Sequence, residues 1–332
     1  MENKNTKIAI LGGGSWATAI AKIVLQNVDK IYWYMRRQEQ IDEFIHLGKN
    51  PFYLTGARFD TNRIHFTDDI NQVIELADIL IFAIPSPYLE DHLKILKVSL
   101  EDKIIISAIK GIIPEKNYII SDFFEAEYKI PKENIAVISG PCHAEEVALE
   151  RLSYLTIASV SSELTKVLHS IFSTDFINIA ISNDIAGIEY SAIMKNIYAI
   201  MSGISHGLKY GDNFQAVLIS NAIQEIDGFC NAIHPFPRNI NQSAYLGDLL
   251  GTAYSQFSRN RLFGNMIGKG YSIRAAKIEL GMIAEGYFAT KCIYETNKKY
   301  KFDLPIVNTA YDILYNNAIP ATKIKELSNK LV

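Results

Sequence analysis

One lysine lies inside an otherwise apolar helical pattern. Residues 185–205 carry only two formal charges, Glu189 and Lys195. Isoleucines recur around them at three- and four-residue spacing, which predicts a largely buried helix. Ser191 and Ala199, one turn away from Lys195 on either side, are small and leave room for a bound molecule. Because burial lowers the pKa of an ammonium group toward neutrality, Lys195 is predicted to be a general acid-base group. The alternative is a lysine that reaches solvent or pairs with an acid.

A second set of polar residues follows at Asp248 and at 258–260. Ser258 has the character of an N-cap, so Arg259 and Asn260 are expected in the first turn of a helix. Backbone amides and a guanidinium group together favour a phosphate there, which predicts a phosphorylated substrate. Taken singly, Asp248 is as readily explained as a helix cap as it is as a substrate ligand. Arg259 is as readily explained as a member of a structural ion pair. Asn196, beside the lysine, binds either a ligand or a neighbouring helix.

A glycine-rich segment, Gly12-Gly13-Gly14-Ser15-Trp16-Ala17, directly follows the first apolar run of the chain. It matches the pattern G-x-G-x-x-G/A, in which Gly12 permits a tight turn and Gly14 lets a pyrophosphate approach the backbone. The N-terminus of the following helix then faces the anion. We therefore predict a dinucleotide site, the alternative being a plain connection between a strand and a helix.

The cofactor specificity is suggested by residues about 20 positions beyond the glycines, where an NAD-specific fold places an acidic residue. This chain has Met35-Arg36-Arg37 at that place. Guanidinium groups suit a 2′-phosphate or stack on adenine, so NADPH is expected to be accepted. The alternative for either arginine is a solvated loop.

Two further loops follow apolar runs in the same half of the chain. Lys110 comes just after residues 104–107, and the loop 139–144 follows residues 135–138. Ligands in doubly wound sheets bind beyond the carboxyl ends of the strands, so both loops are candidates, although Lys110 is equally an ordinary surface lysine. Cys142 and His143 are a poor nucleophile pair, because adjacent residues on a helix do not face each other.

The elements that position these residues follow from the apolar pattern. Short apolar runs predict buried parallel strands at 8–11, 31–34, 79–84, 104–107 and 135–138. Helical spacing separates them at 16–26, 87–97 and 117–127. The stretches 154–159 and 176–181, on either side of a helix at 162–172, extend the sheet. This alternation predicts an α/β fold with an open, doubly wound sheet.

The alternation stops after residue 183, and apolar residues then recur at helical spacing, apart from a loop at 234–239. We therefore expect an N-terminal doubly wound Rossmann domain at 1–185, which binds the dinucleotide, and an all-helical substrate-binding C-terminal domain at 186–332. The cleft between domains is where a site is expected.

Composition narrows the class of protein. The 332 residues include 33 basic and 36 acidic side chains, a formal charge of −3, so no nucleic-acid partner is expected. The longest uncharged stretch, 196–208, is too short to span a membrane. No secretory signal is apparent, which makes the cytoplasm the expected location. The 3 cysteines and 7 histidines show no metal-binding spacing, so no metal is expected.

The chain resembles the bacterial NAD(P)-dependent glycerol-3-phosphate dehydrogenases from end to end. The matching segments are 11–19, 109–111, 139–141 with 144–148, 194–196, 211–213, 246–249, 258–260 and 285–286. The resemblance implies a Rossmann domain, a helical domain and the reversible reduction of dihydroxyacetone phosphate to sn-glycerol 3-phosphate, which supplies phospholipid synthesis. It implies NADPH or NADH as cofactor, and we expect the chain to assemble as a homodimer.

The resemblance also assigns roles to residues, with Lys195 as the general acid-base group. The dinucleotide would be bound by Gly12, Gly14, Ser15, Trp16, Arg36, Arg37, Lys110, Ala144, Arg259 and Glu285. The substrate would be bound by Lys110, Gly140, Cys142, Lys195, Asp248, Ser258, Arg259 and Asn260.

Three places depart from the family pattern. Cys142 stands where the family usually has Ser or Thr, Asn221-Ala222 where it has Arg-Gly, and residues 241–245 where it has a glycine-rich run. Two alternative functions remain open. One is a related two-domain dehydrogenase of a 3-hydroxyacid or a sugar-acid phosphate, and the other is a sensor that binds NADPH without turnover.

Overall fold

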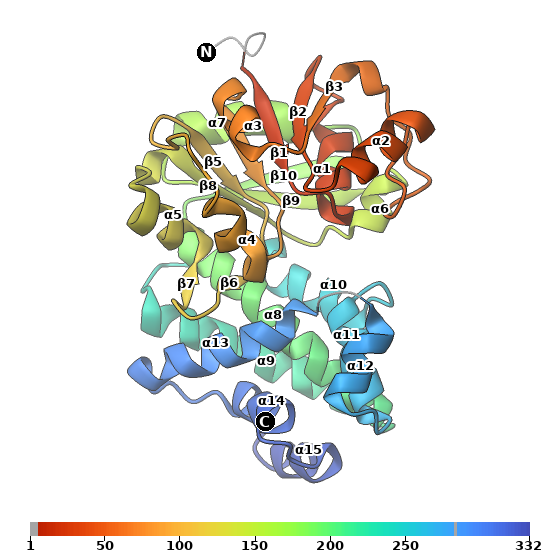
Figure 1. Ribbon diagram of the computed structural model, residues 1–332. Helices are drawn as coiled ribbons and strands as arrows, with labels where there is room; N and C mark the ends of the chain where they lie inside the picture. The colour runs from red at the N-terminus through yellow and green to blue at the C-terminus, as the bar shows by residue number, and fades with distance from the viewer. Residues whose placement is uncertain (1–5, 282–283) are drawn as a thin grey trace. The chain divides into compact units, whose positions relative to one another are not determined.

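The computed structural model describes residues 6–281 and 284–332, which form two compact units (Figure 1). The first, here called the sheet unit, extends to Ile109 and includes Ile120–Ile185. The second, the helical unit, comprises Lys110–Ile119 and the chain from Ala186 onward. The sequence prediction placed residues 110–119 in the first domain, whereas the structure places them in the second unit.

The sheet unit is built on an eight-stranded sheet with the order β10-β9-β8-β5-β4-β1-β2-β3. Neighbouring strands are parallel except β8 and β9, which are antiparallel. The strands are β1 (Ile8–Leu11), β2 (Ile31–Tyr34), β3 (Ile64–Thr67), β4 (Ile79–Phe82), β5 (Ile104–Ser107), β8 (Ile135–Ser139), β9 (Ser153–Ala158) and β10 (Ile177–Ser182). This order reverses direction between β1 and β4, which is where such sheets bind ligands.

Helices connect these strands. They are α1 (Ser15–Val24), α2 (Gln38–Leu47), α3 (Ile70–Leu76), α4 (Ser86–Leu93), α5 (Ile120–Tyr128), α6 (Ala144–Ala148) and α7 (Ser162–Phe172), with short 3₁₀ turns at Thr61–Arg63 and Lys132–Asn134. Alternate strand residues such as Ile10 and Trp33 join one apolar core with α1, α2 and α7. On α5, the ring of Phe124 packs 4.9 Å from that of Phe82 in β4. Because side chains from both faces of the strands are buried, the strands read as continuous apolar runs.

The predicted doubly wound sheet is confirmed, with three local differences. β3 was not predicted, because His65 and Phe66 are not fully buried in this edge strand and the apolar pattern is weak. β9 and β10 extend the sheet as expected, but β9 runs antiparallel to β8. The predicted helix at 117–127 begins only at Ile120, because Tyr118 and Ile119 form a strand.

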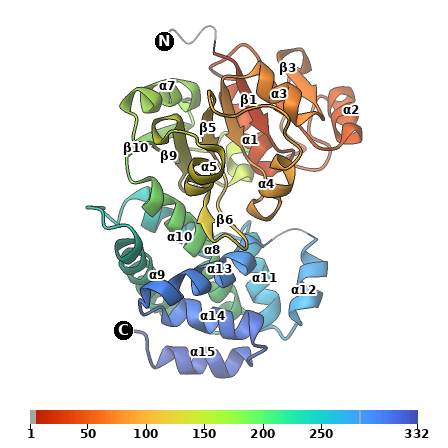
Figure 2. The same ribbon diagram turned by 60° about the vertical axis from the view of Figure 1, so that its left-hand side comes forward.

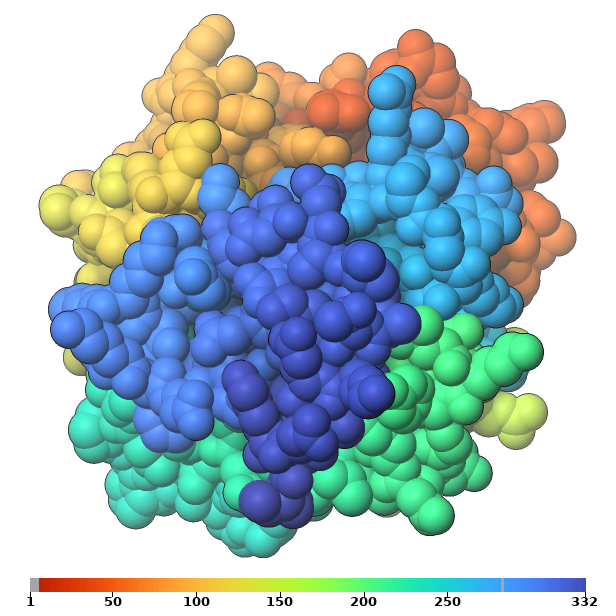
Figure 3. Space-filling model, turned by 90° about the horizontal axis from the view of Figure 1, so that it is seen from below, coloured from red at the N-terminus to blue at the C-terminus, as the bar shows by residue number. Residues whose placement is uncertain are grey.

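The helical unit contains a short antiparallel hairpin, β6 (Ile112–Ile113) and β7 (Tyr118–Ile119), besides its helices. The helices are α8 (Ile185–Gly207), α9 (Asp212–Ile233), α10 (Asp248–Tyr254), α11 (Arg259–Gly268), α12 (Ile273–Leu280), α13 (Glu285–Tyr300), α14 (Pro305–Tyr315) and α15 (Pro320–Ser328), with a π-helical turn η3 at Ser243–Gly247 (Figure 2). Ile112 and Ile119 of the hairpin join the apolar core of this unit. Seen from below in Figure 3, the darkest blue residues, those of α14 and α15, cover the middle of one face of the unit.

The helices α8 and α11 pack with their backbones in contact. A Cβ atom built on Gly203 would lie 2.1 Å from the Arg261 carbonyl oxygen, and one on Gly264 would lie 2.0 Å from that of Ile200. Both distances are far below any real contact, so only glycine fits at these positions. The same spacing repeats one turn on at Gly268, whose Cβ would lie 2.3 Å from the Ile204 oxygen. This packing fixes α11 against the helix that carries Lys195.

A buried carboxylate joins α9 to two other helices of the unit. Glu225 of α9 accepts hydrogen bonds from the backbone N–H of Ile306 at the start of α14 (2.6 Å) and from the Tyr198 hydroxyl of α8 (3.1 Å). It therefore replaces the missing side-chain cap of α14. Burial raises the pKa of Glu225 to about 8, although the Ile306 hydrogen bond acts to lower it.

Candidate functional site

The centre of the candidate site is an amine held by a carboxylate. Lys195 is only 3% exposed, and its ammonium group pairs with Oδ1 of Asp248, the first residue of α10. The other carboxylate oxygen, Oδ2, lies 3.5 Å from Nζ of Lys110. The lysine therefore does pair with an acid, as one alternative held, but it does so inside the unit. One carboxylate between two ammonium groups leaves a net positive charge, which suits an anionic ligand or a developing oxyanion.

The surroundings of Lys195 bring its pKa down to about 7. Burial is the largest cause, and the like charge of Lys110 acts in the same direction, whereas Asp248 raises the pKa. An amine with a pKa near neutrality is present in both protonation states at physiological pH. It can therefore give a proton in one direction of a reaction and take it in the other.

A chain of amide hydrogen bonds surrounds this amine. The Gly286 backbone N–H donates to Oδ1 of Asn260 (2.9 Å), and Nδ2 of Asn260 donates to Oδ1 of Asn196 (3.0 Å). Nδ2 of Asn196 in turn donates to the Lys110 carbonyl oxygen (3.0 Å). Asn196 thus binds neighbouring segments, one of the two roles that the sequence left open. The backbones also pack closely here, because a Cβ on Gly286 would lie 2.5 Å from the backbone carbonyl oxygen of Asn196.

Ser258 caps α11, as the sequence predicted. Its hydroxyl accepts a hydrogen bond from the Arg261 backbone N–H (3.3 Å), so Arg259 begins the helix and Asn260 follows in its first turn. Arg259 is exposed, and it makes no ion pair with any residue that the structure describes. A free guanidinium at a helix N-terminus is well suited to a phosphate group.

Glu285 begins α13 beside the same cations. Burial raises its pKa to about 7, while Arg259, Lys110 and Lys195 act in the opposite direction. Its Oε2 atom is buried and has no hydrogen-bond partner within the described chain. The sequence pattern alone gave no interpretation of Glu285, because its position beside these cations depends on the packing of helices far apart in the chain.

The glycine loop of the sheet unit is held from behind by side chains that the sequence analysis missed. The Trp33 indole N–H donates to the Gly12 carbonyl oxygen (2.7 Å), and Gln40 and Asn50 donate to that of Gly13 (2.9 and 3.1 Å). Each lies well beyond the loop in sequence, and no local pattern marks its role. These hydrogen bonds tie the backbone of the loop to β2, to α2 and to Asn50.

The glycines of this loop fit a dinucleotide. Gly12 has φ +132°, and a Cβ there would lie 2.7 Å from the Ala83 oxygen at the end of β4, so the turn requires glycine. Gly14 is the N-cap of α1 without a side-chain cap, and a Cβ there would meet nothing within 4 Å. Open space at a helix N-terminus is what a pyrophosphate needs.

Five other predicted dinucleotide residues lie in the sheet unit. Arg36 and Arg37 follow β2 with exposed side chains, and neither forms an ion pair with a described residue. Arg36 thus lies just beyond the end of β2, where an NAD-specific fold carries an acidic residue. Ser15 and Trp16 form the first turn of α1, and Ala144 is the first residue of α6.

The loop between β8 and α6 is tied to β9. Gly140 has φ +122°, and a Cβ there would lie 2.5 Å from the Tyr154 carbonyl oxygen. The Cys142 thiol donates to the same oxygen at 3.1 Å, so it has a backbone partner. Substrate contacts by Gly140 and Cys142 stay predictions.

The predicted site residues thus fall into two sets. The helical unit brings together Lys110, Lys195, Asp248, Ser258, Arg259, Asn260 and Glu285. The sheet unit carries Gly12, Gly14, Ser15, Trp16, Arg36, Arg37, Gly140, Cys142 and Ala144. Lys110 was expected at the edge of the sheet, but it belongs to the helical set because the hairpin that follows it packs there.

The residues at the other two departures from the family pattern have well-defined surroundings. Nδ2 of Asn221, in α9, donates to the carbonyl oxygens of Val217 (2.9 Å) and Val332 (2.8 Å). The segment 241–245 runs into the π-helical turn η3, where Ala244 and Tyr245 are buried.

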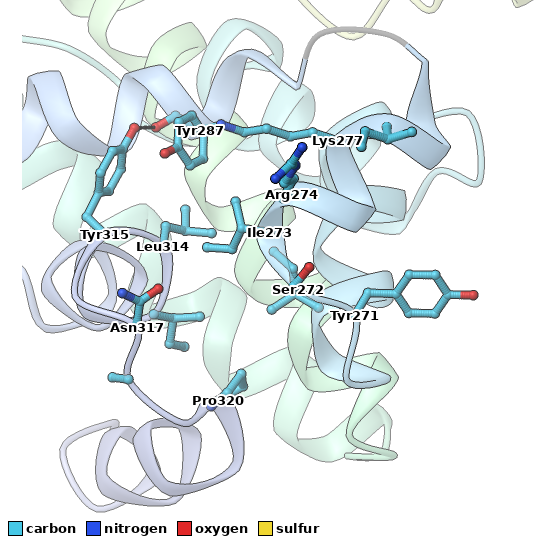
Figure 4. Close-up of a pocket in the computed structure, with 14 residues that line it drawn as sticks. Tyr271, Ser272, Ile273, Arg274, Lys277, Tyr287, Leu314, Tyr315, Asn317 and Pro320 are labelled. Carbon is cyan, nitrogen blue, oxygen red and sulfur yellow. Dashed lines mark hydrogen bonds between the residues drawn. The ribbon is translucent and has the colours of Figure 1, made fainter.

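A cavity of about 810 Å³ lies elsewhere in the helical unit, among residues of α11 to α15, and none of the predicted site residues lines it (Figure 4). There Lys277 places its ammonium 3.3 Å from the centre of the Tyr287 ring, and the Tyr315 hydroxyl donates to the Tyr287 carbonyl oxygen (2.7 Å).

In the described part of the chain, no helix is both long and apolar enough for a bilayer crossing. The same residues include no cluster of three or more potential metal ligands.

Known proteins resemble the whole chain. Family models described as the N-terminus and the C-terminus of NAD-dependent glycerol-3-phosphate dehydrogenase match residues 7–165 and 184–325. The glycerol-3-phosphate dehydrogenase [NAD(P)+] of Bacillus velezensis is 33% identical over 97% of this chain and 93% of its own length, and that of Bacillus subtilis is 32% identical over the same shares. The crystal structure of glycerol-3-phosphate dehydrogenase from Coxiella burnetii has a TM-score of 0.89 at 27% identity and covers 97% of this chain and 98% of its own.

The two family models together cover nearly all of the described chain, and their order matches that of the sheet and the helices. The chain therefore belongs to the NAD-dependent glycerol-3-phosphate dehydrogenase family.

Proposed function

We propose that the chain catalyses the reversible reduction of dihydroxyacetone phosphate to sn-glycerol 3-phosphate with NADPH or NADH. The observation that carries the proposal is the buried amine of Lys195, which pairs with Asp248 and has its pKa lowered to about 7. The names of the relatives support the substrate and the cofactor.

Lys195 performs the proton transfer. As a hydride reaches the ketone carbon, the carbonyl oxygen becomes an alkoxide, which the Lys195 ammonium stabilises and protonates. In the reverse direction the neutral amine takes the hydroxyl proton as the hydride leaves the carbon. Asp248 keeps the amine in place, and Lys110, on the other oxygen of Asp248, adds positive charge beside the developing alkoxide.

The first turn of α11 binds the phosphate of the substrate. Arg259 supplies a guanidinium group that forms no ion pair within the described chain, and the helix N-terminus adds backbone amides. Asn260 has a second amide hydrogen left beyond the one that it gives to Asn196. Anchoring the phosphate fixes the position of the reacting carbon, which can account for a large part of the rate acceleration.

The sheet unit binds the dinucleotide, which supplies the hydride. Gly12, Gly14 and the N-terminus of α1 would hold the pyrophosphate, with Ser15 and Trp16 in the same turn. Arg36 and Arg37 would hold the adenosine end and accept a 2′-phosphate, so that NADPH as well as NADH is used.

The setting of the reaction is part of the proposal. The product would supply glycerophospholipid synthesis in the cytoplasm, where reduced dinucleotides and phosphorylated intermediates are present. The active form would be a homodimer with no nucleic-acid partner, in line with the near-neutral charge of −3. Light scattering on the purified protein would determine the oligomeric state.

The decisive experiment follows the absorbance of NADPH and of NADH in parallel with dihydroxyacetone phosphate as substrate. A panel of 3-oxoacids and sugar-acid phosphates tests the related dehydrogenases. We expect oxidation of either dinucleotide with dihydroxyacetone phosphate and with no other substrate of the panel. We also expect Lys195→Ala to lose turnover while it still binds the dinucleotide. Tight NADPH binding without turnover of any substrate would instead identify a sensor.

A further inference from the structure

The amide chain around the amine runs in one direction. Each carboxamide accepts on its Oδ1 atom and donates from its Nδ2 atom to the next group, from Gly286 through Asn260 and Asn196 to the Lys110 carbonyl oxygen. It joins four segments of the helical unit: the start of α13, the start of α11, the middle of α8 and the segment that leads into the β6–β7 hairpin. Asn196 is 6% exposed, and both ends of its carboxamide are bound to protein groups.

We propose that Asn196 is a positioning residue for catalysis, which holds Lys110 at the correct distance from the Lys195–Asp248 pair. The proposal rests on the proposed dehydrogenase function. Asn196 does not act on substrate in this account, because its acceptor and one donor are bound to the protein. It acts through Lys110, whose backbone it binds.

The backbone contact controls where the Lys110 charge lies. Lys110 has no regular secondary structure of its own, because it lies between β5 and β6. Its ammonium group lies 3.5 Å from Oδ2 of Asp248. If the Asn196 donor is removed, the carbonyl oxygen of Lys110 loses this hydrogen bond, and the bond no longer helps to fix the distance between the Lys110 ammonium and the carboxylate.

Movement of Lys110 has a predictable electrostatic effect on the amine. Four charged groups from separate segments shape the environment of Lys195: Asp248 of α10, Glu285 of α13, Arg259 of α11 and Lys110. Of these, Asp248 and Lys110 act on the pKa of Lys195 most directly, and Lys110 lowers it. Displacement of this like charge must therefore raise the pKa of Lys195. A purely structural role for Asn196 would change stability without such a shift.

The experiment compares pH profiles of kcat/KM for sn-glycerol 3-phosphate oxidation, a reaction that needs the neutral amine. In Asn196→Ala we expect the inflection to rise by about one pH unit, the size of effect produced by a nearby charge, and kcat to fall more than KM rises. Asn297→Ala is the matched control. Asn297 of α13 also donates one hydrogen bond and accepts one, both with Phe302 (2.8 and 3.0 Å), so its loss should lower the melting temperature and leave the inflection in place.

A double-mutant cycle tests whether Asn196 acts through Lys110. In a Lys110→Met background the charge is already gone, so adding Asn196→Ala should leave the residual inflection where Lys110→Met alone puts it. If Asn196→Ala does not fold, Asn196→Leu replaces it. That variant has a similar volume, loses the donor to Lys110 without adding a charge, and must also raise the inflection.

The outcomes separate this proposal from the proposed function. An unmoved inflection in a folded, active Asn196→Ala enzyme, or an equal further shift in the Lys110→Met background, would overturn the positioning role while leaving the dehydrogenase activity intact. A wild-type protein without any activity toward dihydroxyacetone phosphate would overturn the proposed function itself.

Discussion

Replacing Asp248 by asparagine gives the sharpest test of the acid-base assignment. Asp248 is the group that keeps the Lys195 amine protonated, because its charge raises a pKa that burial and Lys110 lower. Asparagine has nearly the same shape but no charge. In Asp248→Asn the pKa of Lys195 must therefore fall below its value of about 7.

The size of the effect follows from the contact. An opposite charge at this range shifts a pKa by about 1–3 units, so a Lys195 pKa of roughly 5 is expected in Asp248→Asn. At pH 8 the ammonium fraction would then fall from about one in ten to about one in a thousand. Reduction of dihydroxyacetone phosphate, which needs the ammonium, should therefore slow about 100-fold at pH 8, since each pKa unit changes the protonated fraction tenfold. Oxidation of sn-glycerol 3-phosphate at low pH should suffer much less, because the neutral amine becomes more abundant.

The assay is kcat/KM in both directions from pH 5 to pH 9, followed by dinucleotide absorbance. Glu285 has a pKa raised to about 7 as well, so the profile is also measured in a Glu285→Gln background, which removes the contribution of that carboxyl group. Thermal unfolding checks that Asp248→Asn remains folded. An oxidation inflection that stays near pH 7 or moves upward in Asp248→Asn would refute the assignment of Lys195.

Three further predictions concern the cofactor, the packing and the buried carboxylate. Arg36→Glu should lower kcat/KM with NADPH at least about tenfold relative to NADH, because a charge-assisted contact contributes about 1.5–3 kcal/mol; an unchanged ratio of the two would contradict the role. Gly264→Ala should lower the free energy of unfolding by about 1–3 kcal/mol in urea titrations, because its Cβ would lie 2.0 Å from the Ile200 carbonyl oxygen. Gly14→Ala should leave the free energy of unfolding unchanged, because a Cβ on Gly14 would have no neighbouring atom within 4 Å in the described chain. Burial raises the pKa of Glu225 to about 8, so its protonated form stabilises the fold, and this contribution is lost as pH rises from the unfolded value to about 8. Between pH 6 and pH 8 the wild-type free energy of unfolding should accordingly fall, relative to that of Glu225→Gln, by on the order of 2 kcal/mol. If the difference between the two proteins stays constant over this range, the pKa of Glu225 is not raised.

The sequence predicted the sheet and the central amine because both depend on local patterns. Buried parallel strands are continuous apolar runs, so β1, β2 and β5 were found with their observed bounds. Lys195 was noticed because a charge interrupts a helix that is otherwise apolar. The N-cap at Ser258 is likewise a local signal, since the cap and the helix it begins are adjacent in the chain.

What the sequence could not predict are contacts between segments far apart in the chain. That Asp248 pairs with Lys195, rather than capping a helix, depends on how α10 packs against α8. The support of the glycine loop by Trp33 and Gln40 depends on the position of β2 and α2 beside it. The close contact of α8 with α11 had a signal that was overlooked, the repeat G-x-x-x-G at 203–207 and again at 264–268.

The path of the chain at Lys110 has a consequence for dissecting the protein. The segment Lys110–Ile119 is encoded within the first half of the gene but folds with the second half. A cut near residue 185 would consequently leave the C-terminal fragment without one of the two ammonium groups on Asp248 and without Ile112 and Ile119 from its core. The halves are therefore not interchangeable modules, and a chimera that exchanges the N-terminal half between two such proteins also exchanges the lysine that pairs with Asp248 and two residues of the helical core.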